Sequence, residues 1–228
     1  MLIACQLQRE GFAVTALEPI GPGFTVFAEL QKKILEYAVR KGCAPCVLPI
    51  PVEKLAAPNN FSLAYSFNVM EHVADVPAAL TQVVNALKDG GEYRFTCPNY
   101  LFPYEPHFNI PTLFSKHLTA WVFRRRIEVS LNVSDPDGTW NSLNWITVPQ
   151  VRRTLKEIGH VRFRFDRTFL ERTLMRIASD PVFAARRSLW LRRLLTITVQ
   201  LGLHRLARLI PATLQPIIDC HVLVKKVP

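Results

Sequence analysis

The chain has 228 residues, of which 49% are hydrophobic and 20% are charged, a composition that predicts a folded core and argues against general disorder. The formal net charge of +10 is uneven, because residues 150–228 carry 16 Lys and Arg against 5 Asp and Glu. Five scattered cysteines exclude a regular disulfide framework, and no signal-peptide pattern opens the chain. We therefore expect a cytoplasmic protein in a reducing environment.

The first hundred residues predict an alternation of helices and strands, separated by glycine and proline breaks such as Gly21-Pro22-Gly23. Strands are expected at 12–17, 47–50, 63–67 and 92–97, and helices at 2–9, 26–40 and 76–87. Strands and helices that alternate at this spacing predict an α/β fold, with a parallel sheet and helices on both faces.

The pattern is looser in the rest of the chain. Residues 100–146 predict a long irregular insertion around one helix near 112–126. A helix at 148–158 and a strand at 161–165 follow, and the last strand is expected at 220–226. Residues 169–215 then form a basic helical insertion between the last two strands, and we expect one domain over residues 1–228.

The most informative segment is 61–99, which forms one strand–helix–strand unit. It contains NVMEHV at 68–73, LKDGG at 87–91 and Pro98-Asn99, in that order. This segment resembles the second half of the nucleotide-binding core of class I S-adenosylmethionine-dependent methyltransferases, in their small-molecule branch. The resemblance implies a Rossmann-like sheet with an antiparallel C-terminal hairpin, S-adenosylmethionine as cofactor, and ligands at the carboxyl ends of the strands.

The resemblance also implies a glycine-rich loop, an acidic residue followed by GxGxG, after the first strand. No such loop occurs in the sequence, and Met1–Ala4 corresponds to the middle of the helix that should follow it. In this fold the first strand is central, so its loss would leave backbone groups unpaired at two strand edges. We therefore expect that the first strand and glycine loop are missing and that the chain is a truncated form of a longer protein.

Three residues are candidates for contact with the cofactor. Glu18 ends the first visible strand, where the family holds the ribose hydroxyls, although a solvated glutamate would look the same. Glu53 lies near the expected adenine position, with an ordinary charge at a helix start as the alternative. Asn68 is the first polar residue after strand 63–67 and faces the crevice for the amino-acid end of the cofactor.

Two histidines are candidates for catalysis. His72, in NVMEHV, would orient the cofactor or act as a general base, or else hydrogen bond the backbone as a structural histidine. His107 lies in Tyr104–Phe108, a loop that either faces the substrate or only packs. Methyl transfer needs alignment of the nucleophile rather than a metal. The one CxxC motif, Cys43 to Cys46, lacks partners at zinc-site spacing, so no metal site is predicted.

The basic segment 186–210 predicts an amphipathic helix with five of its six arginines and His204 on one face. Its uncharged stretch is too short to span a bilayer. The helix would lie peripherally on an anionic membrane, or cover the sheet with its arginines in water. The third alternative is that the helix binds nucleic acid. The lack of aromatic residues between the arginines argues against this.

The sequence therefore predicts S-adenosylmethionine-dependent methylation of a small molecule, in particular a lipid-linked or saccharide one. The alternative is a non-catalytic binding or scaffold protein that kept the fold and lost the cofactor. A nucleic-acid methyltransferase is a third interpretation, and the absence of an Asn/Asp-Pro-Pro-Tyr motif counts against it.

Overall fold

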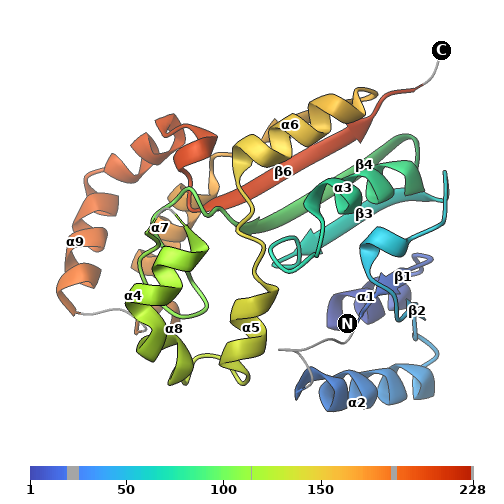
Figure 1. Ribbon diagram of the computed structural model, residues 1–228, viewed down its shortest axis with the longest axis horizontal. Coiled ribbons are helices and arrows are strands. Elements are labelled where there is room, and N and C mark those ends of the chain that lie inside the picture. Colours follow the sequence, from blue (N-terminus) through green and yellow to red (C-terminus); the bar gives the residue numbers. More distant parts are fainter. Residues whose placement is uncertain (20–25, 114, 186–188, 227–228) are drawn as a thin grey trace.

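The structure is a computed structural model that describes residues 1–19, 26–113, 115–185 and 189–226. Figure 1 shows the arrangement of its elements. The strands are β1 (Thr15–Leu17), β2 (Cys46–Leu48), β3 (Phe61–Phe67), β4 (Leu87–Pro98), β5 (Val161–Phe165) and β6 (Ile217–Val224). The helices are α1 (Leu2–Arg9), α2 (Val26–Arg40), α3 (Val76–Ala86), α4 (Lys116–Glu128), α5 (Pro136–Ser142), α6 (Val148–Ile158), α7 (Phe169–Ser179), α8 (Pro181–Ala185) and α9 (Leu189–Gln200), and the 3₁₀ helices are η1 (Val52–Lys54), η2 (Leu203–Leu209) and η3 (Ala212–Leu214).

Within the described residues the strands form two sheets. The larger one has the order β3-β4-β6-β5, and the smaller one pairs β1 with β2 in parallel. β3 and β4 are parallel, whereas β6 runs antiparallel to both β4 and β5. The predicted α/β architecture is thus confirmed, including the antiparallel hairpin that the last two strands form.

The two sheets are separate from each other, and the division lies between β1 and β3. Among the described residues β1 pairs only with β2, and β3 pairs only with β4. The side chains of Leu63 and Phe67 on β3 are 60% and 47% exposed, unusually high for apolar residues of a strand. The family resemblance implies a further strand at this division. Its absence from the protein, and a truncation of the chain, stay predictions.

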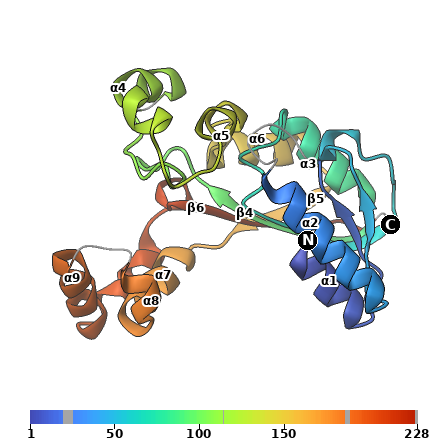
Figure 2. The same cartoon turned by 90° about the horizontal axis from the view of Figure 1, so that it is seen from below.

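Helices cover both faces of the larger sheet, as predicted. Figure 2 shows α3 and α6 on one side of β4 and β6, and α7, α8 and α9 on the other side at the far end. Capping residues define the ends of α3 and α6. The side chain of Asp75 accepts a hydrogen bond from the Ala78 N–H at the start of α3, and Thr147 does the same for Gln150 in α6. Gly159, with φ of 79°, ends α6.

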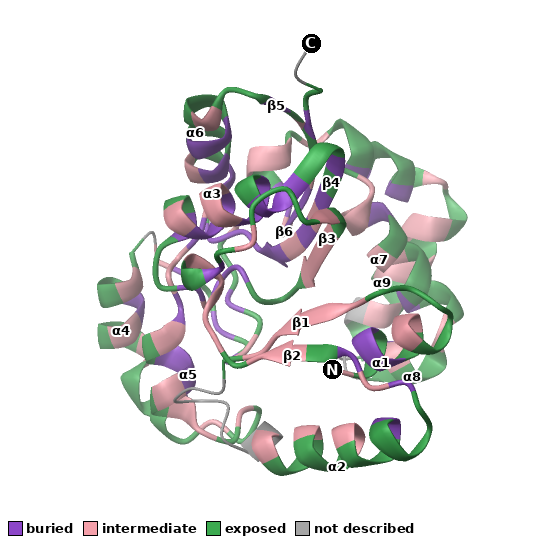
Figure 3. Ribbon diagram, turned by 90° about the vertical axis from the view of Figure 1, so that its right-hand side faces the viewer, coloured by how far each residue is buried: buried purple, intermediate pink, exposed green. Residues whose placement is uncertain are grey.

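The core lies between the larger sheet and the helices α3 and α6. Figure 3 shows buried residues gathered on these elements, while α2 and α9 are largely exposed. Alternate side chains of β4 and β6 point into this core, and the loops after β4 and before α6 close it. Its fully buried apolar residues include Leu80, Val84, Phe95, Cys97, Ile110, Leu143, Ile146, Val151, Leu155, Ile218 and Cys220.

The two insertions differ in detail from the prediction. The first carries two helices, α4 and α5, where one was expected. In the second, a single helix over 186–210 is wrong, because α9 ends at Gln200 and Gly202, with φ of 73°, turns the chain into the separate 3₁₀ helix η2. His204, expected on an arginine face, is buried. Arg186 and Arg187 lie outside the described residues.

None of the described helices is long and apolar enough to cross a membrane.

Asn99, directly after β4, ties the sheet to the end of the second insertion. It is 1% exposed, and its amide nitrogen donates to the carbonyls of Thr213 and Gln215 at 3.0 and 2.8 Å. We expect Asn99→Ala to lower the free energy of unfolding by about 1–3 kcal/mol, because buried carbonyls lose their donor. Urea denaturation measures this loss. Asn85→Ala, on the exposed side of α3, is the control, and an equal effect of both substitutions would contradict this role of Asn99.

Candidate functional site

Three loops meet beyond the carboxyl ends of β3 and β4. The first is 68–75, which follows β3, the second is 99–110, which follows β4, and the third is 143–147, which connects α5 to α6. β3 and β4 are parallel neighbours, so the loops that follow them start at the same edge of the sheet. The sequence predicts a ligand site at this edge, and this is where polar side chains converge.

Asn144 fastens the third loop to the first. Its amide nitrogen donates to the carbonyls of Met70 and Val73 at 2.7 and 2.8 Å, and its backbone N–H donates to the Glu71 carbonyl at 2.8 Å. The segment around Glu71 is irregular, so it has no ladder of its own to satisfy these carbonyls. One asparagine therefore holds the backbone that carries Glu71 and His72.

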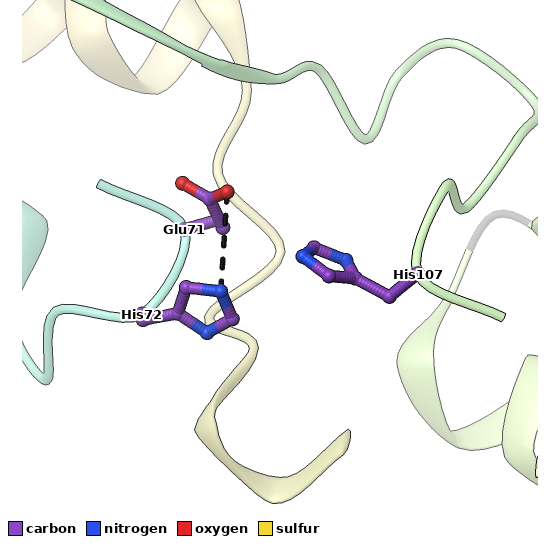
Figure 4. Close-up of side chains that lie close together, drawn as sticks. All are labelled: Glu71, His72 and His107. Carbon is purple, nitrogen blue, oxygen red and sulfur yellow. Dashed lines mark ion pairs between the residues drawn. The ribbon is translucent and has the colours of Figure 1, made fainter. Parts of the chain in front are cut away.

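Glu71, His72 and His107 point toward one another in this site (Figure 4). The His72 Nε2 atom lies 3.9 Å from the Glu71 Oε1 atom. The rings of His72 and His107 meet edge to face, with their centres 5.3 Å apart. Glu71 is fully buried, whereas the side chains of His72 and His107 keep 12% and 23% of their surface exposed. The cluster thus has a closed side at the carboxylate and an open side at the rings.

Glu105 fixes the ring of His107. The Nδ1 atom of His107 lies 2.6 Å from Oε1 of Glu105, and the other carboxylate oxygen accepts the Phe108 N–H at 2.7 Å. The hydroxyl of Tyr100 donates to the same Oε1 at 3.3 Å. Because an ionised carboxylate only accepts, Nδ1 of His107 carries the proton of this contact. Its Nε2 atom is then the one available to the cluster.

Ser142 fixes the ring of His72 in the same way. The Ser142 hydroxyl donates its one proton to the Thr139 carbonyl at 2.7 Å, so it acts as acceptor at its 2.8 Å contact with Nδ1 of His72. Nδ1 of His72 is therefore protonated. In the neutral ring, Nε2 carries the lone pair and faces Glu71.

Burial acts on the pKa values of all three groups. It raises the pKa of Glu71 to about 7, and the charge of Glu105 raises it further, while the backbone of Glu71 and the charge of His107 act against this. Burial likewise lowers the pKa of His72 to about 4, helped by the positive charge of His107. For His107, burial acts downward, but the hydrogen bond and charge of Glu105, with the charge of Glu71, raise the pKa overall.

The structure brings two of the five predicted site residues together and places the other three elsewhere. His72 and His107 come together, although the 34 residues between them include α3 and β4. Asn68 lies at the end of β3 with φ of 52°, and its N–H donates to the Thr96 carbonyl. Glu18 follows β1 in the smaller sheet. Glu53 accepts hydrogen bonds from the N–H groups of Ala74 and Asp75 at the start of α3. The cofactor contacts of Asn68, Glu18 and Glu53 stay predictions.

The two carboxylates of the site were not predicted from the sequence. Glu71 was visible in NVMEHV beside His72, and Glu105 two residues before His107, but neither was assigned a role. Glutamate is rarely buried unless paired, and burial is not visible in a segment without periodicity. An aromatic wall behind the site was equally hidden, with Tyr100 stacked on Trp145 at 4.3 Å between ring centres.

Comparison with known proteins places the chain in a family. No known family profile matches it. Two proteins of Mycobacterium tuberculosis, the uncharacterized protein MT1557 of strain CDC 1551 and the uncharacterized protein Rv1509 of strain H37Rv, are each 46% identical to it over 222 residues, which cover 97% of this chain and 75% of the relative. The chain belongs to the Rv1509 family.

Solved structures identify the fold of this Rv1509-family chain. Phosphoethanolamine N-methyltransferase 2 of Haemonchus contortus matches 97% of the chain with a TM-score of 0.50 and 16% identity. The geranyl diphosphate C-methyltransferase of Streptomyces coelicolor matches 97% with a TM-score of 0.50 and 10% identity. The chain spans 46% of the length of the first enzyme and 67% of the second. The fold is that of class I S-adenosylmethionine-dependent methyltransferases.

The contact of His72 with Ser142 makes a spectroscopic prediction. Since burial lowers the pKa of His72 to about 4, its ring should be neutral at pH 6, where an ordinary histidine is mostly charged. Nitrogen-15 NMR of the chelator-treated protein should show the tautomer protonated at Nδ1, and Ser142→Ala should mix the two tautomers. The exposed Ser62→Ala is the control. A wild-type ring protonated at Nε2 would refute the assigned direction of this hydrogen bond.

Proposed function

We propose that the protein transfers a methyl group from S-adenosylmethionine to a small molecule. The observation that carries this proposal is the convergence of His72, His107 and two buried carboxylates beyond the carboxyl ends of β3 and β4, in a methyltransferase fold. Ligands of doubly wound folds bind at this edge. We expect the substrate to be lipid-linked or a saccharide.

The fold neighbours support the cofactor and the size of the substrate. The Haemonchus enzyme is described in complex with phosphomonomethylethanolamine and S-adenosylhomocysteine. The Streptomyces enzyme is described in complex with Mg²⁺, geranyl diphosphate and S-adenosylhomocysteine. Both act on small molecules, which favours a small-molecule substrate here.

In this proposal the chain binds the cofactor through residues at the ends of two strands. Glu18, after β1, accepts hydrogen bonds from the ribose hydroxyls, and Asn68, after β3, contacts the amino-acid end. Glu53 remains a candidate near the adenine, although its Oε1 atom is already bonded to the start of α3. The bound cofactor supplies a methyl group on a sulfonium, and the protein supplies binding and orientation.

His72 and His107 would then contact the substrate. Both rings are held by a second group, Ser142 and Glu105 respectively, so they offer fixed polar edges at the open side of the cluster. Fixed edges align the attacking atom of the substrate with the methyl group. Well-oriented reactants gain effective molarities of roughly 10⁵–10⁸ M, which makes this alignment the main contribution of the protein to the rate.

Cofactor binding tests the proposal. Calorimetry on the protein produced from its own gene should show stoichiometric binding of S-adenosylhomocysteine. Glu18→Ala should weaken it roughly 10- to 100-fold, because a charged hydrogen bond contributes about 1.5–3 kcal/mol. Glu36→Ala, an exposed glutamate of α2, is the matched control.

A protein that binds neither S-adenosylmethionine nor S-adenosylhomocysteine would contradict the proposal and favour the non-catalytic scaffold. Binding that Glu18→Ala leaves unchanged would reject the ribose role of Glu18 alone.

We also propose that the second insertion contacts an anionic membrane and so approaches a lipid-linked substrate. Several large apolar side chains of α9 and η2 are strongly exposed, among them Trp190 at 68% and Leu209 at 73%. Arg193 and Arg205, also exposed, lie among these residues in the sequence. Apolar side chains flanked by arginines suit the boundary between headgroups and acyl chains.

Vesicle co-sedimentation tests the membrane contact. The protein should sediment with vesicles that contain phosphatidylglycerol and much less with pure phosphatidylcholine. Trp190→Ser combined with Leu194→Ser should reduce this binding several-fold, because apolar area no longer enters the bilayer. Val182→Ser, on the exposed surface of α8, is the control, and equal sedimentation of all three proteins would contradict the proposal.

A further inference from the structure

Two groups of three side chains in the described part of the chain have donor atoms close enough to share a metal ion. One consists of Asp166, Asp219 and His221 on the larger sheet. Its buried carboxylate, Asp219, is already neutralised by Arg94, which donates through two nitrogens at 3.2 and 3.0 Å. That group is a structural ion pair. The other group is Glu71, His72 and His107.

Glu71 has no comparable partner. Its side chain is 0% exposed, and neither carboxylate oxygen has a hydrogen bond within the described residues. The nearest nitrogen in an ion pair is Nε2 of His72 at 3.9 Å, which is beyond hydrogen-bonding distance. A buried carboxylate without a donor is costly, so it is neutralised either by a proton or by a cation bound beside it.

Both histidines beside Glu71 are held so that Nε2, not Nδ1, is the nitrogen left for the cluster. Ser142 holds Nδ1 of His72 in the protonated form, and Glu105 does the same for Nδ1 of His107. In the neutral rings both Nε2 atoms are therefore acceptors. With both rings neutral, the point between them and the Glu71 carboxylate favours a cation, which is either a proton, as the raised pKa of His107 indicates, or a metal ion.

The distances suit a metal ion. One donor atom from each residue lies within 4.8 Å of the other two. A divalent ion with bonds of about 2.0–2.2 Å holds its donors ~3.0–3.5 Å apart, so the cluster needs a contraction of about 1 Å. Small rotations of three side chains supply this movement.

The surroundings also match those of metal-binding histidines. Such histidines donate their second ring N–H to a carboxylate or another acceptor, which orients the ring and raises its basicity. Here Glu105 plays this part for His107 and Ser142 for His72. Both partners are themselves held, Glu105 by the Phe108 N–H and Ser142 by the Thr139 carbonyl.

We propose that Glu71, His72 and His107 bind one divalent metal ion of the manganese-to-zinc series. No metal site was predicted from the sequence, because the CxxC motif lacks partners at zinc-site spacing and methyl transfer does not require a metal. Two nitrogens and one carboxylate form a set that favours these ions over Mg²⁺ and Ca²⁺, which prefer oxygen. The remaining coordination positions lie on the open side of the cluster, at the exposed edges of the two rings.

The metal would bind an oxygen of the substrate and lower its pKa. This role rests on the proposed methyl transfer, whereas metal binding itself does not. S-adenosylhomocysteine binding to metal-free protein, measured in the same preparation, keeps the two questions apart, since either can fail alone.

Calorimetry with zinc chloride on the chelator-stripped full chain tests the site. We expect one Zn²⁺ per chain, and binding of Mg²⁺ at least tenfold weaker. Glu71→Gln and His107→Gln should each weaken Zn²⁺ at least tenfold, and Glu105→Gln, which releases the ring of His107, about 10- to 100-fold. His117→Gln, an exposed histidine of α4, is the matched control and should bind as the wild type.

The cysteines are the competing zinc ligands. A chain with Cys43→Ser and Cys46→Ser should keep its Zn²⁺, so loss of binding in this variant would overturn the proposal. Absence of stoichiometric Zn²⁺ from the wild type, or full retention by Glu71→Gln and His107→Gln, would overturn it equally.

A readout on the wild type guards against variants that do not fold. Addition of one equivalent of Zn²⁺ should shift the ring nitrogen-15 signals of His72 and His107 and leave those of His117 in place. Unmoved His72 and His107 signals would reject the site.

Discussion

Phe67 on β3 pairs with Thr96 on β4, and the N–H of Asn68 donates to the Thr96 carbonyl where β3 ends. This parallel register decides where the chain leaves each strand. The loop with Glu71 and His72 and the loop with Glu105 and His107 therefore begin side by side, and Asn144 holds the first of them from the third loop. The site depends on this register, because a slip of one residue would turn every side chain to the opposite face.

The electrostatics of the site follow from its burial. Glu71 and Glu105 are both fully buried, but Glu105 accepts three hydrogen bonds and Glu71 accepts none from another described residue. Two carboxylates of one site thus differ in role: one orients a histidine, and the other faces an open cluster. Acidic groups whose surroundings shift their pKa values are typical of functional sites.

Much of the fold could be predicted from the sequence, because its signals are local. The helices at 2–9, 26–40 and 148–158 were predicted at their observed bounds, since a glycine follows each of them. β4 is longer than predicted, because residues 88–91 bulge from a strand that already begins at Leu87. The prediction of one helix over 186–210 was wrong for a different reason. Apolar periodicity does not show whether Gly202 adopts a positive φ.

The site could be predicted only in part. His72 follows a strand in a recognisable motif, and His107 stands in a loop rich in aromatic residues. Their meeting depends on tertiary structure, as do the burial of Glu71 and the fastening by Asn144, which lies 74 residues from Met70. Long-range hydrogen bonds of this kind leave no periodic trace in a sequence.

The most direct test of the account is a crystal structure of the protein grown with S-adenosylhomocysteine and Zn²⁺. The account predicts the homocysteine end of the ligand beside Asn68, at the carboxyl end of β3, with the metal between Glu71, His72 and His107 on the substrate side. A ligand bound elsewhere, or a cluster closed by a hydrogen bond between Glu71 and a histidine with no metal, would contradict it.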